Sequence, residues 1–406
     1  MGDRAGGAQR AAGRDRGLSP EPSLLALEYT PSLPRHVAAR VSRRAGEGAL
    51  RLTEMRPPRL PGDDWLAVRP LLAGICGSDQ ALVSGAASPY LASVTSGPFV
   101  PGHEVVGQIA SGPRRGERVV VEPALGCTAR SIAPPCPECA EGLEALCRNV
   151  VDGSVSAGLQ VGFCRDTGGG WSEGLVAHDS QLHTLPRELG DEDAVLVEPL
   201  ACALHVARAL EPSSGQTIAV IGAGTIGLLA LAALRELAPE ASVMAVAKHA
   251  GQAHEARRLG ADHVATPQSF HLEGARLTGA RRLVGHQGRE LLLGGFDSVL
   301  DCVGSGASIE AAITATKPRG TVALAGMPGR LTVDLAMAWQ REIVIRGAYG
   351  YRRDFPEAIE LAGRLRPGRL VARGWHLSEY RSALEQAPRA ARSGRVKTVF
   401  DLREAA

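Results

Sequence analysis

The stretch "GQTIAVIGAGTIGLLALAALREL", residues 215–237, decides the fold of this chain. Its apolar run 217–221 predicts a strand, and an Ala- and Leu-rich helical pattern follows the glycines. A lone G-x-G-x-x-G pattern is weak evidence, but a strand before it and a helix after it are the context of dinucleotide binding. Gly222 would permit the tight turn, Gly224 the approach of a pyrophosphate to backbone N–H groups, and Gly227 close packing of helix on sheet. The alternative is an ordinary strand-to-helix turn.

The chain downstream alternates apolar runs with a helical pattern. A helix is expected at 250–260, and strands are expected at 241–250, 261–266, 296–305, 320–329 and 342–350. Repeated β–α alternation predicts a doubly wound parallel sheet over residues 187–345. Ligands bind at the carboxyl ends of such strands, where "DCVGS" lies. Asp301 in that stretch is predicted either to touch the cofactor or to cap a turn, with neither favoured.

The end of the second expected strand bears on the choice of nucleotide. NAD-binding sheets usually place an acid about 20 residues past the glycines, where it binds the ribose 2′-OH. Here that position is Ala247, and Lys248 and His249 follow it. A 2′-phosphate is tolerated beside a cation, so NADP is favoured over NAD. The alternative for Lys248 is a merely solvated side chain.

Four of the eight cysteines fall in residues 126–147, "GCTARSIAPPCPECAEGLEALC". No signal peptide precedes them, which predicts a cytoplasmic chain with reduced thiols rather than disulfides. A Cys-x2-Cys pair with two further thiols is the usual composition of a closed, structural zinc site. The predicted ligands are Cys127, Cys136, Cys139 and Cys147. The alternative is four unrelated small buried residues.

Potential ligands for a second metal are spread along the chain. Cys76 offers a thiolate, His103 an imidazole, and Glu104 and Glu198 carboxylates, each in an apolar setting. Any one of them alone is more often a packing residue than a ligand. Two glutamates within apolar stretches are harder to dismiss, because burying an unpaired charge is costly. Three protein ligands plus an exchangeable water distinguish a catalytic zinc from a structural one.

The bulk composition argues against some classes of function. The chain has 406 residues, 44% hydrophobic and 22% charged, and a formal net charge of +2. Its length allows two domains with sizeable cores, and its charge gives no reason to expect a nucleic-acid or membrane partner. No apolar run is long enough for a membrane span. Residues 1–22 are Gly-, Ala- and Arg-rich and are expected to be a disordered leader.

Over residues 23–400 the chain resembles the zinc-dependent medium-chain dehydrogenase/reductase superfamily, the alcohol dehydrogenase-like group. The resemblance rests on "GICGSD", "PGHEVVG", the cysteine lobe, "VEPLACALH", "VIGAGTIG" and "DCVG", in that order. It implies a mainly β GroES-like catalytic domain at 23–186 with a zinc lobe at 127–147. A Rossmann domain at 187–345 and a return to the catalytic domain at 346–406 would follow.

The resemblance also implies roles for site residues. Cys76 and His103 match the ligands of the catalytic zinc, and Glu104 matches a family glutamate at or near the metal. Glu198 lies in a Glu-Pro-Leu similar to the polyol, glucose and threonine dehydrogenase branch, in which this glutamate binds zinc directly or through its water. Ser78 matches the hydroxyl residue that passes the substrate proton onward.

The sequence departs from the family pattern in two places. Cys127 lies eight residues before the Cys-x2-Cys pair rather than two, because "TARSIAPP" is inserted between them. Many relatives also place a histidine soon after the Cys-Gly-Ser/Thr-Asp motif to complete a proton relay. Here Gln80, Ala81 and Leu82 follow the motif. The resemblance therefore gives no proton path beyond Ser78.

The expected function is hydride transfer between a secondary alcohol and NADP or NAD, with one catalytic and one structural zinc. A polyol, sugar or hydroxy-amino acid is favoured over a simple aliphatic alcohol, and its carbonyl form is the other reactant. Relatives form dimers or tetramers, so a homo-oligomer is expected. The alternatives are a zinc-free quinone or enone reductase of the same superfamily and a non-catalytic, NADP-binding redox sensor.

Overall fold

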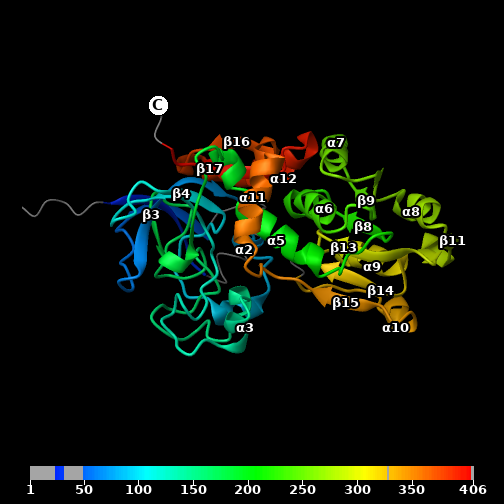
Figure 1. Cartoon of the computed structure of the whole chain (residues 1–406), viewed down its shortest axis with the longest axis horizontal. Helices are drawn as coiled ribbons and strands as arrows, with labels where there is room; N and C mark the ends of the chain where they lie inside the picture. Colours follow the sequence, from blue (N-terminus) through cyan, green and yellow to red (C-terminus); the bar gives the residue numbers. More distant parts are fainter. Residues whose placement is uncertain (1–22, 32–48, 327–328, 404–406) are drawn as a thin grey trace, which may run out of the picture.

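A computed structural model describes residues 23–31, 49–326 and 329–403 and consists of two domains side by side (Figure 1). The predicted leader, residues 1–22, lies outside the described residues. None of the described helices is long and apolar enough to cross a membrane.

One domain is the predicted doubly wound sheet. Its six strands are all parallel and lie in the order β10-β9-β8-β13-β14-β15. This is the 3-2-1-4-5-6 order of dinucleotide-binding sheets, so the predicted fold class is confirmed. The strands are β8 (Thr217–Ile221), β9 (Ser242–Val246), β10 (His263–Ala265), β13 (Phe296–Asp301), β14 (Thr316–Leu324) and β15 (Val344–Gly347).

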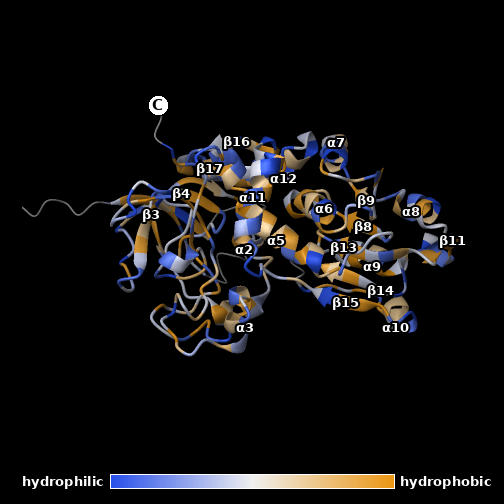
Figure 2. Cartoon of the chain, viewed as in Figure 1, coloured by the Kyte–Doolittle hydropathy of each residue, from blue (hydrophilic) through white to orange (hydrophobic). Residues whose placement is uncertain are grey.

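Helices cover both faces of this sheet, because alternate strand residues point to opposite sides. In β8, Ile218 and Val220 pack with α5 and α6, whereas Ala219 and Ile221 pack with α8 and α9. Figure 2 shows α6 and the sheet mostly in hydrophobic colours. The helices are α5 (Val197–Arg208), α6 (Thr225–Leu237), α7 (Ala250–Arg258), α8 (Phe270–Thr278), α9 (Gly306–Ala315) and α10 (Ala336–Gln340).

A β-hairpin inserted between α8 and β13 was not expected from the sequence. It pairs β11 (Arg281–Val284) with β12 (Glu290–Leu293) around the short 3-10 helix η4 (His286–Gly288). Every residue of β11 is exposed, so the alternation of buried and exposed positions that reveals a strand is missing there.

The other domain is built on a seven-stranded, mostly antiparallel sheet in the order β16-β17-β3-β4-β5-β7, with β6 also paired to β3. Its strands are β3 (Trp65–Gly74), β4 (Val105–Ile109), β5 (Arg118–Val121), β6 (Leu175–His178), β7 (Leu182–Thr184), β16 (Val371–Trp375) and β17 (Lys397–Asp401). A separate antiparallel pair joins β1 (Leu24–Tyr29) to β2 (Leu50–Met55). The helices are α2 (Gly77–Val83), α3 (Pro137–Ala140), α4 (Asp191–Ala194), α11 (Phe355–Leu365) and α12 (Tyr380–Ala390). The 3-10 helices are η1 (Pro89–Val94), η2 (Glu144–Leu146), η3 (Asp179–Gln181), η5 (Pro367–Leu370), η6 (Leu377–Glu379) and η7 (Ala391–Ser393).

The chain returns to this sheet after the nucleotide-type domain. β17 pairs antiparallel with β3 and parallel with β16, so the C-terminal segment lies beside the strand that leads to Cys76. The exact domain limits stay a prediction, but the return after residue 346 places β17 next to the ligands described below.

Candidate active site

Three of the predicted metal ligands meet where two strands of the catalytic sheet end or begin. Cys76 follows β3 and caps α2, and His103 and Glu104 directly precede β4. One ligand atom from each of the three lies within 4.8 Å of the other two. His103 and Glu104 are buried and Cys76 is half-buried. A thiolate, an imidazole and a carboxylate are donors that zinc accepts.

Glu104 is held by a buried ion pair. Both of its carboxylate oxygens accept hydrogen bonds of 2.6 Å from the Lys397 ammonium group, and both residues are 2% exposed or less. Gly74 makes room for this carboxylate, because a Cβ at Gly74 would lie 1.8 Å from Glu104 Oε2. The Lys397 charge balances the Glu104 carboxylate, so this carboxylate is less available to a metal ion than an unpaired one would be.

Asp79 connects the other two members of the group. It is fully buried, its Oδ2 accepts the backbone N–H of Cys76 at 2.9 Å, and its Oδ1 lies 3.5 Å from His103 Nδ1. Burial opposes protonation of His103, but Asp79 and Cys76 outweigh it and raise the pKa of His103 well above its usual value. A carboxylate beside one ring nitrogen fixes the orientation of a metal-binding histidine.

Glu198 lies close to the group of three but does not belong to it. It is the second residue of α5, is 6% exposed, and accepts a hydrogen bond of 3.4 Å from the Cys202 thiol, one helix turn later. Burial raises the pKa of Glu198 to about 7; the charge of Glu104 adds to this shift, and the charges of His103 and Lys397 oppose it. Glu198 therefore stands within electrostatic reach of the cluster from the neighbouring domain's first long helix.

Two residues with hydroxyl groups bear on this cluster: Ser78, two positions after Cys76 in the sequence, and Tyr349, which feels its charges. Ser78 is half-buried in α2, and its side chain makes no hydrogen bond within the described part of the chain. Tyr349, in the segment after β15, is 48% exposed as a whole residue. Burial around its hydroxyl nevertheless raises the pKa of Tyr349 to about 12, with Cys76 and Glu198 among the charges that act on it.

The four predicted lobe cysteines form a second cluster. Their sulfur atoms all lie within 4.8 Å of one another, and all four residues are buried. All eight cysteines of the chain are free thiols. Cys136 caps α3, Cys139 lies within α3, and Cys147 ends η2. Cys127 reaches the cluster in spite of its eight-residue separation from Cys136, and the arrangement is that of a structural zinc lobe.

Backbone and side-chain N–H groups point at these sulfurs. Cys136 N–H donates to Cys127 Sγ at 3.3 Å, and the Asn149 side-chain amide donates to the same sulfur at 3.2 Å. Burial would raise the pKa of the Cys127 thiol, but these hydrogen bonds outweigh it and lower that pKa to about 7. Burial raises the pKa of Cys147 to about 11. The cluster thus favours a thiolate at Cys127, whereas Cys147 needs a nearby cation to favour its thiolate.

The glycine-rich loop has the geometry that the sequence predicts. Gly222 has a φ of +98°, which favours glycine, and its N–H donates to the Val246 carbonyl at 3.1 Å. A Cβ at Gly227 would lie 1.8 Å from the Gly222 carbonyl oxygen, whereas a Cβ at Gly224 would meet nothing within 4 Å. Gly224 caps α6, so the space beside it opens onto the N-terminus of that helix.

The other predicted cofactor residues lie at the carboxyl ends of neighbouring strands. Lys248 is exposed after β9, and His249 caps α7. Asp301 is fully buried at the end of β13, and its carboxylate accepts the N–H groups of Val303 and Gly304 at 3.2 and 3.0 Å. Its hydrogen bonds are thus those of a turn cap, and a contact between Asp301 and the cofactor stays a prediction.

A short C-terminal segment links the glycine loop to the ligand cluster. The Val396 carbonyl accepts the Thr225 hydroxyl of the loop at 3.3 Å. The next residue, Lys397, pairs with Glu104, and the Thr398 carbonyl accepts the Ile75 N–H at 2.9 Å. The two candidate sites are therefore connected through consecutive residues at the start of β17.

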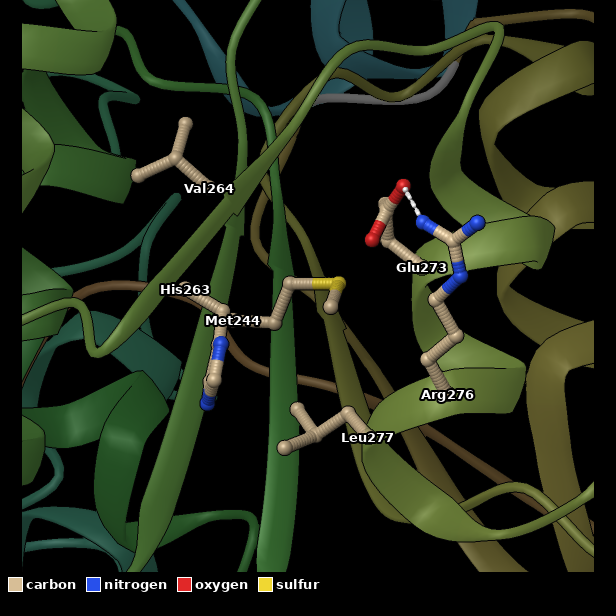
Figure 3. Close-up of a pocket in the computed structure, with 6 residues that line it drawn as sticks. All are labelled: Met244, His263, Val264, Glu273, Arg276 and Leu277. Carbon is tan, nitrogen blue, oxygen red and sulfur yellow. Dashed lines mark hydrogen bonds and ion pairs between the residues drawn. The ribbon is translucent and has the colours of Figure 1, made fainter.

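Two hollows elsewhere are not lined by the clustered ligands. One, of about 280 Å³, lies between β10 and α8, and Figure 3 shows that its Glu273 and Arg276 are paired with each other, at 2.8 Å. The other, of about 300 Å³, lies beside the cysteine lobe, where Glu122 pairs with His183 at 2.6 Å. Glu144 also lines the second hollow, and its buried Oε2 has no hydrogen-bond partner among the described residues. Neither hollow brings together a group of ligands like those of the two clusters.

The sequence did not predict Asp79, Cys202, Tyr349 or Lys397 as neighbours of the cluster. For Asp79 and Lys397 a signal was present, because each is a charged residue next to apolar stretches that predict burial. Nothing in the sequence marks Tyr349, which lies just after the edge strand β15 and is within electrostatic reach of the cluster.

Two protein-family models match the chain. The alcohol dehydrogenase GroES-like domain matches residues 62–187, and the zinc-binding dehydrogenase matches residues 225–364.

Individual relatives agree with this result. A probable zinc-binding alcohol dehydrogenase of Mycobacterium tuberculosis is 31% identical over 81% of this chain and 79% of its own length. Sorbitol dehydrogenase of Bacillus subtilis is 25% identical over 88% of this chain and 95% of its own length. The fold matches the crystal structure of an Escherichia coli oxidoreductase of unknown specificity, with a TM-score of 0.72 and 22% identity, over 94% of this chain and 99% of that one.

Proposed function

The chain belongs to the zinc-binding medium-chain dehydrogenases, and from this membership we propose that it oxidises a secondary alcohol of the polyol, sugar or hydroxy-amino-acid type with NADP. The observation that carries the proposal is the meeting of Cys76, His103 and Glu104, with Glu198 near them. This cluster is connected to the glycine loop through the start of β17. Hydride transfer here would need a zinc ion held by this cluster and a nucleotide bound at the glycine loop.

The residues present fit a catalytic zinc. They supply a thiolate, an imidazole and two carboxylates, and the buried His103 Nδ1 and Asp79 Oδ1 atoms have no other hydrogen-bond partner among the described residues. We propose Cys76, His103 and Glu198 or Glu104 as its ligands. The Lys397 charge balances the Glu104 carboxylate, which favours Glu198 as the carboxylate that binds the zinc.

A bound zinc would supply a Lewis acid for the alcohol oxygen, and a bound nicotinamide would accept the hydride. The protein's residues would do the rest. We propose that Ser78 receives the hydroxyl proton and hands it on, while Asp79, 3.5 Å from His103 Nδ1, keeps the His103 ring in one orientation. The carbinol C–H bond breaks with its electron pair, so the products are the carbonyl compound, reduced nucleotide and one proton.

The nucleotide would lie across the carboxyl ends of β8 and β9. Gly224 leaves its pyrophosphate open access to the N-terminus of α6. Lys248 is exposed at the end of β9 and no acid precedes it, which supports a 2′-phosphate there. The preference is therefore for NADP, with Lys248 and His249 as the residues nearest to that phosphate.

The substrate class is supported by the Glu-Pro-Leu at residue 198 and by the similarity to sorbitol dehydrogenase. Polar groups around the cluster, including the half-exposed Tyr349, suit a substrate with several hydroxyls. The individual alcohol is left to a screen.

A second copy of the chain is the partner we propose for the free edge of the nucleotide-type sheet. β15 is the last strand of that sheet, and its Val344 and Ile345 are 47% and 39% exposed. Trp339, at the end of the preceding helix α10, is 84% exposed. An unpaired apolar edge favours pairing with an identical edge across a two-fold axis.

The test is the zinc content per chain, measured by elemental mass spectrometry on wild type, Cys76→Ser and Cys139→Ser. We expect two zinc ions in wild type and the loss of a different one in each variant. Alcohols and polyols would then be screened with NADP and NAD by the absorbance of the reduced nucleotide. A single zinc that survives in Cys76→Ser would contradict the proposal and leave the zinc-free or non-catalytic alternatives.

A further inference from the structure

Arg130 is fully buried but pairs with no carboxylate among the described residues. It lies in the inserted stretch 128–135, between Cys127 and Cys136, where the chain departs from the usual spacing. Its exposed fraction is 0%. Removing an unpaired charge from water costs several kcal/mol, so a buried arginine without an anion needs another source of stabilisation.

The guanidinium group donates only to main-chain carbonyls. It reaches five of them: Leu125 at 2.9 Å, Asp152 at 2.8 Å, Val155 at 3.1 Å, Ser156 at 3.4 Å and Gly158 at 2.5 Å. One carbonyl comes from just before Cys127 and the other four from the segment that follows Cys147. Carbonyl dipoles solvate a charge but do not neutralise it, so the buried guanidinium keeps its positive charge within the segments that flank the four cysteines.

We propose that Arg130 is the buried counter-charge of a four-thiolate metal site formed by Cys127, Cys136, Cys139 and Cys147. Four thiolates around a divalent cation leave two net negative charges in a buried place. The lobe's other arginine, Arg148, is 65% exposed and committed to Glu138. Arg130, whose backbone N–H donates to the Cys127 carbonyl at 3.2 Å, is thus the buried arginine of the two.

The electrostatics of the lobe agree with this assignment. Burial lowers the pKa of Arg130, and the charges of Cys164, Cys147 and Cys127 favour its protonated form. The dependence is mutual, since a metal-free lobe with neutral thiols would leave the arginine unbalanced, and a lobe without the arginine would leave the thiolates unbalanced.

The main chain of Arg130 also holds the lobe's two segments together. Ser154 N–H donates to the Arg130 carbonyl at 3.0 Å, and Gly153 has a φ of +91°. A Cβ at Gly153 would lie 2.4 Å from that carbonyl oxygen, so the segment 152–158 closes tightly over the insertion. Charge and hydrogen bonding are therefore separate contributions, and a test has to distinguish them.

The experiment compares Arg130→Lys, which keeps the charge, with Arg130→Gln, which keeps part of the hydrogen bonding. Both are made in full-length Cys76→Ser protein, so that only lobe zinc is counted, and zinc release to a chromogenic chelator is followed. Loss of a residue supporting a metal site costs about 10- to 100-fold in affinity, and we expect an acceleration of that order in Arg130→Gln. Arg130→Lys should stay much closer to the parent, and Arg148→Gln, the matched exposed arginine, should release zinc at the parent rate.

Each other outcome decides the question. A parent-like rate in Arg130→Gln, or equal acceleration in the Lys and Gln variants, would overturn the counter-charge. Failure of both variants to hold lobe zinc, with nucleotide binding retained as evidence of folding, would overturn it too, because one of them keeps the charge. The inference rests on the proposed lobe metal, and absence of zinc in the parent itself would identify that proposal as the one that fails.

Discussion

At the scale of single residues, the buried Glu104–Lys397 pair makes the sharpest claim. Lys397→Met should destabilise the chain by about 3–5 kcal/mol, because it leaves the Glu104 carboxylate buried without its cation. Urea unfolding followed by circular dichroism measures the loss. The double variant Lys397→Met/Glu104→Gln removes both charges and should recover most of it. A single variant as stable as wild type would show that the carboxylate has another partner.

Glu198 predicts a pH dependence of the zinc-free protein. Its pKa is about 7 when folded and 4.5 as the ordinary value, so between these pH values the folded state holds the extra proton. The free energy of unfolding must therefore fall as pH rises from about 4.5 to about 7, by about 3 kcal/mol in total for this group. Glu198→Gln has no carboxyl to ionise and should lack that decline. Parallel stability curves for the two proteins, from urea unfolding at a series of pH values, would contradict the prediction.

The sequence predicted the ligands of the site better than their neighbours. Cys76, His103 and Glu104 could be picked out because thiol, imidazole and carboxylate groups in apolar stretches need a reason to be buried. Lys397 lies 293 positions from Glu104, and no local pattern reports which buried cation meets which buried anion. Asp79 was not predicted because it lies in the same motif as Cys76 and Ser78, and the resemblance assigns roles only to those two residues.

At the scale of elements, two glycines of one loop should respond differently to the same added methyl group. Gly227→Ala should push α6 from β8 and lower the thermal unfolding temperature, since its Cβ would lie 1.8 Å from the Gly222 carbonyl. Gly224→Ala has open space and an extended φ of −82°, so the protein should fold as wild type. If the pyrophosphate approaches there, Gly224→Ala should instead weaken binding of NADPH, measured by fluorescence titration. Undiminished NADPH binding in Gly224→Ala would move the pyrophosphate elsewhere.

Element prediction succeeded for the strands of the parallel sheet and failed for the hairpin β11–β12. The core strand β8 is an apolar run ended by the glycine loop, and all of its residues after Thr217 are buried, a pattern that packing on both faces imposes. β11 lacks this signal, because it begins with two arginines and is exposed throughout. From the sequence alone, its residues are equally consistent with a loop.

At the scale of the whole molecule, the site depends on the order in which the chain visits its domains. The catalytic sheet is completed by β17 only after the nucleotide-type domain has been built, and that strand delivers Lys397 to Glu104 and the Val396 carbonyl to Thr225. A family resemblance could imply this return, but the contacts it makes follow from packing of segments distant in sequence. The composition and local periodicity of the chain do not contain them.

The free edge of the nucleotide-type sheet gives the last prediction, the assembly of the chain. If β15 pairs with the β15 of a second copy, Ile345→Lys should place two charges across the two-fold axis and yield a monomer, because like charges repel at a buried seam. Leu60→Lys is the control, since Leu60 is 50% exposed but lies in the catalytic domain, away from this edge. Mass from light scattering should halve for the first variant and stay unchanged for the second, with unfolding temperatures near wild type in both. An unchanged mass in Ile345→Lys would mean that this apolar edge does not hold copies together and that its exposed side chains serve another contact.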